Sequence, residues 1–125
     1  MENVLLVALG GIFGAVSRYL IGDYSSRHFS ASFPFATLVI NFAGSLLIGF
    51  FLIWTSERVL ADPRWRLLVA VGFCGAFTTF SSYAFESLKL FEQGSIELTL
   101  LNIALNNFAA LTAVVAGAAL ARRIA

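Results

Sequence analysis

Hydroxyl side chains gather inside a long apolar part of the chain. The stretch GAFTTFSSY at 75–83 lies within an apolar segment that runs from Leu67 to Leu90. Its hydroxyl groups follow a glycine and belong to Thr78, Thr79, Ser81, Ser82 and Tyr83. Polar groups in hydrocarbon are costly unless they pair or face water, so they often mark functional sites. Such a cluster could bind or conduct a small polar solute.

The same stretch is poorly suited to a continuous helix. Gly75 is a weak helix former, and the hydroxyls of Thr78 and Thr79 compete for backbone groups. We therefore expect an interruption near Gly75–Thr79. A broken helix occurs at membrane depth only where it is buried in protein or lines a cavity. Its freed carbonyl groups can then bind cations.

Other polar residues recur at helical spacing in the remaining apolar segments. Asn41 shares one helix face with Thr37, Gly44 and Ser45, and Asn102 and Asn106 are four residues apart. Three charged residues also lie within apolar segments, namely Arg18, Glu86 and, at the end of its segment, Lys89. More ordinary roles stay open for several of these. The two later asparagines could join helices, Arg18 could reach the headgroups, and Glu86 could pair with Lys89.

The available groups favour an anion over a cation. Amide and hydroxyl donors beside the positive edges of aromatic rings offer a place for a small anion. Only Glu86 is a deep acid, whereas cation channels use acidic rings. The sequence contains no His/Cys/Asp metal cluster, no phosphate-binding loop and no nucleophile–base pair, because the sole histidine, His28, is expected in a loop. We therefore expect that this protein is not an enzyme.

Composition places the chain in a membrane. Of its 125 residues, 59% are hydrophobic and 12% are charged, about half the charged fraction of a soluble domain. A net charge of +1 gives no indication of a nucleic-acid partner. The single cysteine, Cys74, excludes an intrachain disulfide and is expected to pack in the interior. The first apolar segment has neither a basic region before it nor a small-residue cleavage site, so we expect it to be retained.

Four apolar segments organise residues 1–125 into a single four-helix membrane domain. They span about 4–21, 35–55, 67–90 and 98–121, and each approaches the roughly 20 residues that a helix needs to cross the hydrocarbon. We therefore predict an all-α membrane protein with four transmembrane helices, the third broken in mid-membrane. Short connections would place both termini on one side of the bilayer.

The charges favour one orientation only weakly. The predicted side of the termini carries Arg58, Arg64, Arg66, Arg122 and Arg123. The opposite side carries Arg18, Arg27 and Lys89. The difference slightly favours a cytoplasmic N-terminus. A chain with so small a bias could insert either way up.

Small residues supply surfaces for close helix packing. Gly10 and Gly14 form a GxxxG pair in the first segment. The fourth segment carries a stripe made of Ala109, Ala113, Gly117 and Ala121. Either surface could pack within one subunit or form a dimer seam. Four helices enclose little space, so a solute pathway would favour a partner, most simply a second copy of the chain.

Four motifs together resemble the small microbial fluoride channels known as the Fluc or CrcB family, over essentially the whole chain. GGIFGAVSRY at 10–19 resembles the family's glycine-rich first helix, and FATLVINFAGSLLIG at 35–49 resembles its GTLxxNxxG motif. GFCGAFTTFSSYAFE at 72–86 resembles the signature GxxGGxTTFSTFxxE, which is the most specific of the four. LLNIALNN at 100–107 resembles the polar start of the fourth helix.

The resemblance implies a passive, fluoride-selective channel that exports fluoride across the cytoplasmic membrane and protects the cell from its toxicity. Family members are antiparallel, dual-topology homodimers with two fluoride pathways. A structural sodium ion lies at the dimer centre. By residue, the resemblance implies that the carbonyls of Gly75 and Thr78 bind this sodium. The implied partners are a second copy of the chain, fluoride and the lipid bilayer.

The resemblance also implies a set of residues along the pathway. Asn41 corresponds to the pore asparagine, and Phe80 and Tyr83 correspond to the pore aromatics. Arg18 corresponds to the arginine that ends the first helix, where it would face a vestibule. The polar track that follows implicates Ser81, Ser82, Glu86, Asn102 and Asn106.

Four positions depart from the family pattern. Ala36 and Ala76 replace glycines, and Ala110 stands where many members have serine. Tyr83 replaces the second phenylalanine and adds a phenol donor to the implied path. We expect the second ring site to bind an anion differently because of this hydroxyl.

Two other classes of protein are alternatives. A small proton-coupled exporter of multidrug or guanidinium-type cations also has four spans, but is expected to carry a deep acidic residue in its first helix. Here Glu2 stands at the very start of the chain. A non-transporting subunit of a larger membrane complex would show no ion flux when purified. Organic-cation uptake and ion flux in liposomes separate these classes from a channel.

Overall fold

The protein is built from helices throughout the part of the chain that the structure describes. In the computed structural model these residues are 1–30, 32–57 and 62–124. Three of the four long helical units are α1 (Glu2–His28), α2 (Phe35–Glu57) and α6 (Ile96–Ile124). The remaining unit is the third span, which consists of α3 (Pro63–Trp65), the π-helical segment η1 (Arg66–Cys74), α4 (Gly75–Phe77) and α5 (Phe80–Glu92).

All four units are long and apolar enough to cross a membrane. The prediction of an all-helical protein with four membrane-capable helices is therefore confirmed. Each helical unit contains the predicted apolar span and continues beyond it at one end or both. The added turns are more polar, as expected where helices enter the headgroup region.

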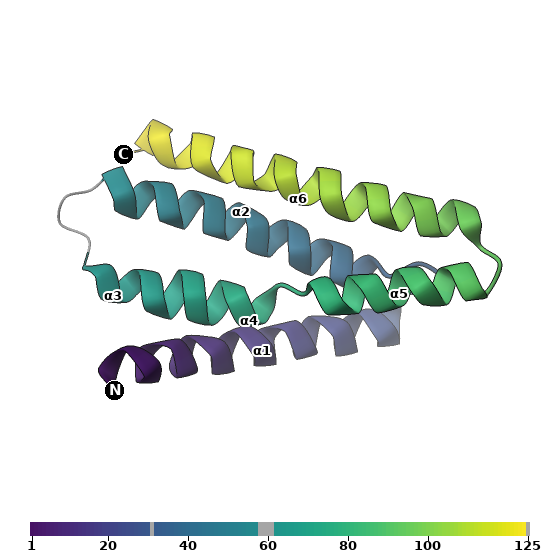
Figure 1. Cartoon of the computed structure of the whole chain (residues 1–125), viewed down its shortest axis with the longest axis horizontal. Coiled ribbons are helices and arrows are strands. Elements are labelled where there is room, and N and C mark those ends of the chain that lie inside the picture. Colours follow the sequence, from purple (N-terminus) through teal and green to yellow (C-terminus); the bar gives the residue numbers. More distant parts are fainter. Residues whose placement is uncertain (31, 58–61, 125) are drawn as a thin grey trace.

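The four units lie roughly along one common direction (Figure 1). The α6 helix packs along α2, the third span follows, and α1 covers the third span on its other side. The N- and C-termini lie at the same end of the bundle. Four of the five arginines assigned to that end are described. Arg64 pairs with Glu2 at 3.1 Å and Arg122 with Glu57 at 3.5 Å, whereas Arg58 lies outside the described residues.

The third span bends at two consecutive threonines. Thr78 has φ −75° and ψ 156°, and Thr79 has φ −149° and ψ 117°, so both have extended backbone between α4 and α5. This bend falls inside the range in which the sequence predicts an interruption. The π-helical turns of η1 precede it. Such turns are rare in proteins overall, and those that do occur are often found at functional sites.

Glycines bring α1 against the third span within one subunit. A Cβ atom added to Gly10 would collide with the carbonyl oxygen of Leu68, and one added to Gly14 would collide with that of Phe73. The GxxxG pair therefore serves packing inside the subunit, which was one of its two predicted roles.

The small-residue stripe of α6 has the same function against α2. A Cβ atom added to Gly117 would collide with the carbonyl oxygen of Leu46. Ala113 and Ala121 are completely buried. The seam between α2 and α6 is thus also internal to the subunit.

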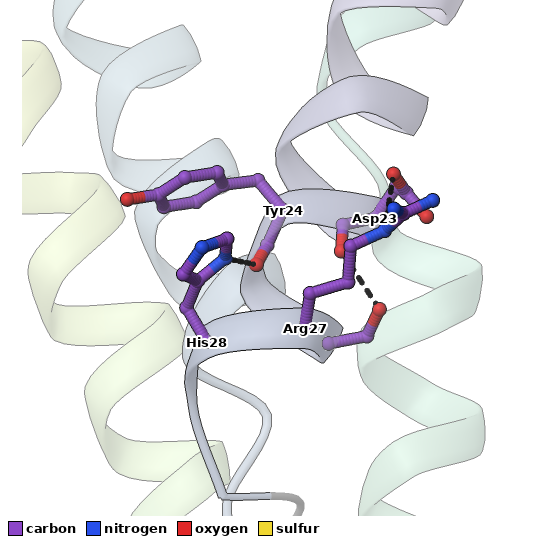
Figure 2. A network of polar contacts seen from close by, with 5 residues as sticks. Asp23, Tyr24, Arg27 and His28 are labelled. Atoms are coloured by element: carbon purple, nitrogen blue, oxygen red, sulfur yellow. Dashed lines mark hydrogen bonds and ion pairs between the residues drawn. The ribbon is translucent and has the colours of Figure 1, made fainter.

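The last turn of α1 is closed by local contacts (Figure 2). Nδ1 of His28 donates to the Tyr24 carbonyl oxygen at 2.8 Å, and the two rings stack with centroids 4.1 Å apart. Arg27 pairs with Asp23 at 3.1 Å. The prediction that His28 lies in a loop is wrong, because α1 extends through this residue. A basic ring is favourable there, since the C-terminal end of a helix is electronegative.

Candidate functional site

A cavity of about 370 Å³ surrounds the bend of the third span. It lies between α2, α6 and the bend. Six residues predicted from the sequence border it, namely Asn41, Gly75, Thr78, Phe80, Tyr83 and Asn106. No carboxylate is found among the described residues of its lining. The remaining predicted residues, Arg18, Ser81, Ser82, Glu86 and Asn102, lie outside this lining.

Asn41 holds the extended backbone of Thr79 from the neighbouring helix. The Thr79 N–H donates to Asn41 Oδ1 at 2.8 Å, and Asn41 Nδ2 donates to the Thr79 carbonyl oxygen at 3.0 Å. The second hydrogen of that amide is directed to Asn106 Oδ1 at 3.1 Å. A side chain on α2 thus replaces the helical hydrogen bonds that the bend removes.

The hydroxyls of the bend complete the helix ends on either side of it. Thr79 Oγ1 accepts from the Ser82 N–H at 3.1 Å and so caps α5. The same oxygen lies 3.0 Å from Ser82 Oγ and 3.4 Å from Ser81 Oγ. Thr78 Oγ1 donates to the Cys74 carbonyl oxygen at 2.8 Å. The unusual run of hydroxyls therefore has a local structural use.

Two carbonyl groups at the bend lose their usual helical donors. The Thr79 N–H, which would bond to the Gly75 carbonyl in a regular helix, bonds to Asn41 instead. The Ser82 N–H, which would bond to the Thr78 carbonyl, bonds to Thr79 Oγ1. These are the two carbonyls that the resemblance implies as sodium ligands. Backbone oxygens are hard ligands that fit a hard cation, and a carbonyl oxygen has two lone pairs, so the Thr78 oxygen keeps one beside its contact with Arg18 Nη1 at 3.5 Å.

Arg18 reaches the bend from α1. Its Nη1 lies 3.5 Å from the Thr78 carbonyl oxygen and donates to it across 60 positions in the sequence. The side chain thus points into the subunit at this depth. The alternative prediction, in which Arg18 extends to the lipid headgroups, does not agree with this contact.

Aromatic rings form an edge-to-face pair at the start of α5. The rings of Phe80 and Tyr83 have centroids 5.2 Å apart at an interplanar angle of 69°. Phe80 is 76% exposed on the isolated subunit, whereas Tyr83 is buried. Asn107 donates to the Tyr83 hydroxyl oxygen at 3.2 Å and also borders the cavity. This leaves the phenolic hydrogen available to another acceptor.

Asn107 was not among the residues predicted from the sequence. Its neighbour Asn106 shares the helical spacing with Asn102, whereas Asn107 lies outside that pattern. The signal that could have indicated Asn107 was Tyr83, which replaces a phenylalanine of the family pattern. A buried phenol needs a polar partner, and Asn107 is that partner.

Glu86 meets a hydroxyl and not a cation. Its Oε1 accepts from Thr37 Oγ1 at 2.7 Å. Its Oε2 is buried and has no hydrogen-bond partner among the described residues. The alternative pairing with Lys89 is therefore not formed here.

Comparisons with known proteins agree on one family. The family model described as "CrcB-like protein, Camphor Resistance (CrcB)" matches residues 5–118. A protein of Koribacter versatilis named "Fluoride-specific ion channel FluC" is 51% identical over 99% of this chain and 98% of its own length. Proteins of the same name from a Sulfurihydrogenibium species and from Agrobacterium fabrum are 45% and 40% identical, each over 99% of this chain and at least 99% of their own lengths.

These matches include all four helical units and the bend. The motifs that suggested the resemblance, at 10–19, 35–49, 72–86 and 100–107, lie within the matched range. These matches and the four membrane-capable helices together identify a multi-pass membrane protein. The chain belongs to the CrcB family.

Proposed function

We propose that this protein is a fluoride-selective ion channel that exports fluoride passively across the cytoplasmic membrane and so protects the cell from fluoride toxicity. The observation that carries this proposal is the near full-length similarity to proteins named fluoride-specific ion channels, at up to 51% identity. The cavity at the bend supports it, because amide and hydroxyl groups and ring edges border it without a carboxylate. The lining carries no fixed negative charge, and the Tyr83 hydroxyl hydrogen and the exposed Phe80 ring remain to face an anion, because the side-chain amides of Asn41, Asn106 and Asn107 already donate within the chain.

The proposed pathway runs past the start of α5. Asn41, Phe80 and Tyr83 border the cavity and would form its narrow part. A polar track would continue through Ser81, Ser82, Glu86 and Asn106. Asn102 is completely buried and accepts from Asn106, so it would support this track without contacting the ion. Arg18 would attract anions into the vestibule that precedes the pathway. The exposure of the Phe80 ring on the single subunit supports a pathway completed by a second chain.

The functional unit in this proposal is an inverted homodimer with the third span of each subunit broken in mid-membrane. The carbonyl groups of Gly75 and Thr78 from both subunits would bind one sodium ion on the two-fold axis. This assignment is supported by the hydrogen bonds of Thr79 and Ser82, because their N–H groups bond to side chains instead of to these two carbonyls. The ion would supply positive charge that holds the two bends together.

A proton-coupled cation exporter is less consistent with the charged groups. The first helix carries its acidic residues near its ends, where Glu2 pairs with Arg64 and Asp23 pairs with Arg27. An exporter of this class needs an acid that faces its substrate at depth. Glu86 lies within an apolar segment, but it belongs to α5 and not to the first helix, and its carboxylate accepts a hydrogen bond from Thr37.

Flux from liposomes tests the proposal. Purified protein in liposomes loaded with potassium fluoride should release fluoride when valinomycin provides a potassium path, with or without a pH gradient. Liposomes loaded with chloride are the matched control and should release little. Equal chloride release would contradict selectivity, and proton-driven uptake of an organic cation in place of fluoride release would favour the exporter.

A further inference from the structure

A series of side-chain hydrogen bonds, part-buried at its start and buried further on, leads away from the bend. It begins with the Thr79 N–H, which donates to Asn41 Oδ1 at 2.8 Å. Asn41 Nδ2 then donates to Asn106 Oδ1 at 3.1 Å. Asn106 Nδ2 in turn donates to Asn102 Oδ1 at 2.9 Å. The series thus passes from the third span to α2 and then to α6.

The series returns to the third span below the bend. Asn102 Nδ2 donates to Ser87 Oγ at 3.0 Å, and the Ser87 hydroxyl donates to the Tyr83 carbonyl oxygen at 2.8 Å. The series therefore begins and ends in the third span. Its first donor is the Thr79 N–H, and its last acceptor is the Tyr83 carbonyl in α5. We call the side chains of Asn41, Asn106, Asn102 and Ser87 the amide ladder.

The backbone of Thr79 sets the direction of every bond in the ladder. Asn41 faces both the N–H and the carbonyl of Thr79, so its amide has only one orientation that pairs a donor with each acceptor. Asn106 must then present its oxygen to Asn41 and its NH₂ group to Asn102. All donors point the same way, and aligned hydrogen bonds polarise and strengthen one another.

Burial makes the ladder sensitive to the loss of any member. Asn102 is 0% exposed, and Asn106 and Ser87 are buried as well. A buried polar group that loses its partner is costly because water cannot replace it. Asn102 and Ser87 are not among the residues that border the cavity, so the cavity gives a permeating ion no direct contact with them.

We propose that Asn102 and Ser87 are positioning residues that act through Asn106 and Asn41 to hold the extended backbone of Thr79. Their effect on transport rests on the proposed channel function. Their effect on the bend does not, since it concerns only the hydrogen bond of the Thr79 N–H. The ladder would keep the carbonyls of the bend and the ring of Phe80 in one place while an ion passes.

Two readouts on the same variants test this proposal. The first is hydrogen exchange of the Thr79 amide by NMR on isotope-labelled protein in micelles. The second is fluoride efflux from liposomes, divided by the amount of correctly assembled protein. Asn102→Leu removes the ladder's centre at similar volume, and Ser87→Ala is a milder variant if the first fails to fold. Thr112→Ala is the matched control on α6, because this exposed hydroxyl bonds only to its own helix at the Phe108 carbonyl.

We expect Asn102→Leu and Ser87→Ala to speed exchange at Thr79 about tenfold or more, as the loss of one buried hydrogen bond implies. Efflux per assembled protein should fall in parallel. Ser87→Thr, which keeps the hydroxyl, should restore both readouts, and Thr112→Ala should change neither. Unchanged Thr79 exchange in a folded variant would overturn the proposal, and so would faster exchange with normal efflux. If the unmodified protein conducted no fluoride, the channel assignment would fail while the exchange experiment still decided the ladder's effect on the bend.

Discussion

At the scale of single residues, the site depends on where a few amide and hydroxyl groups point. Asn41 bonds to the backbone of Thr79 and also to Asn106, so its three contacts join two helices to the bend. Phe80 projects from the subunit beside these groups with most of its surface exposed. These two side chains make the most direct tests of the proposed pathway.

Replacing Asn41 with aspartate should reduce fluoride efflux at least about tenfold while the proposed dimer stays assembled. The carboxylate has no donor for the Thr79 carbonyl or for Asn106, and it would repel an anion at short range. The lost interactions of about 1–3 kcal/mol each correspond to such a factor. Efflux from liposomes with size-exclusion chromatography of the same sample measures both quantities. Normal efflux from assembled protein would remove Asn41 from the pathway.

Replacing Phe80 with isoleucine should slow fluoride efflux and leave thermal stability nearly unchanged. Isoleucine keeps apolar bulk but has no positive ring edge to offer an anion. The ring is 76% exposed on the subunit, so its removal leaves little cavity in the core. Efflux rates and thermal unfolding of the same preparation separate the two effects. A clear loss of stability with normal efflux would show that the ring serves packing.

The residue types of the site could be predicted, but several of their partners could not. A hydroxyl run behind a glycine and an asparagine within an apolar span are visible in the sequence. The contact of Glu86 with Thr37 joins residues 49 positions apart, and that of Asn107 with Tyr83 depends on the rotation of α6 against α5. Such pairs follow from helix packing, and helical spacing within one segment does not determine them.

At the scale of helices and segments, close packing of α1 on the third span positions the bend. The carbonyl of Leu68 lies where a side chain at Gly10 would be. The close approach of α1 to the third span requires glycine at this position. It also brings Arg18, two turns beyond Gly10, within hydrogen-bond distance of the Thr78 carbonyl. The packing of α1 and the environment of the bend are therefore linked.

Gly10→Ala should destabilise the protein by about 1–3 kcal/mol, because the added methyl group overpacks the contact with the third span. Gly22→Ala is the matched control in the same helix, since nothing lies within 4 Å of a Cβ atom at that position. It should be neutral or stabilising by about 0.4–1 kcal/mol. Thermal unfolding in detergent micelles measures both variants. Equal effects of the two substitutions would contradict the packing assigned to Gly10.

The number and type of the helices were predictable because apolar length alone determines which segments can span a membrane. Other features depend on local geometry. The π-helical turns of η1 have no distinct composition, and α1 continues past Asp23 to His28 because an ion pair and a stacked ring support its last turn. The small-residue surfaces were visible in the sequence, but their partners within the subunit became evident only from the packing of Gly10 and Gly117.

At the scale of the whole molecule, the subunit leaves large apolar side chains of α5 and α6 uncovered. Phe80, Phe108 and Leu111 are each at least 65% exposed. Lipid or a second subunit must cover these surfaces. An inverted homodimer would cover part of them and bring two bends together on one axis.

Dual topology predicts that each loop is found on both sides of the membrane. Gln93 is exposed at the end opposite the termini and is suited to a single-cysteine variant, Gln93→Cys in a Cys74→Ala background. About half of the protein should react with an impermeant maleimide in intact cells, because the weak charge bias lets both orientations insert. Labelling after permeabilisation gives the total. Complete labelling or none in intact cells would exclude the inverted dimer.

The proposed function is tested most directly by the reversal potential of current through the purified protein in a planar bilayer. With a tenfold fluoride gradient and equal chloride on both sides, a fluoride-selective channel should reverse near 59 mV, the value for one charge per tenfold gradient. The potential should stay there when chloride or pH is made unequal. A reversal near zero, or one that followed the chloride or proton gradient, would contradict the assignment of this protein as a fluoride channel.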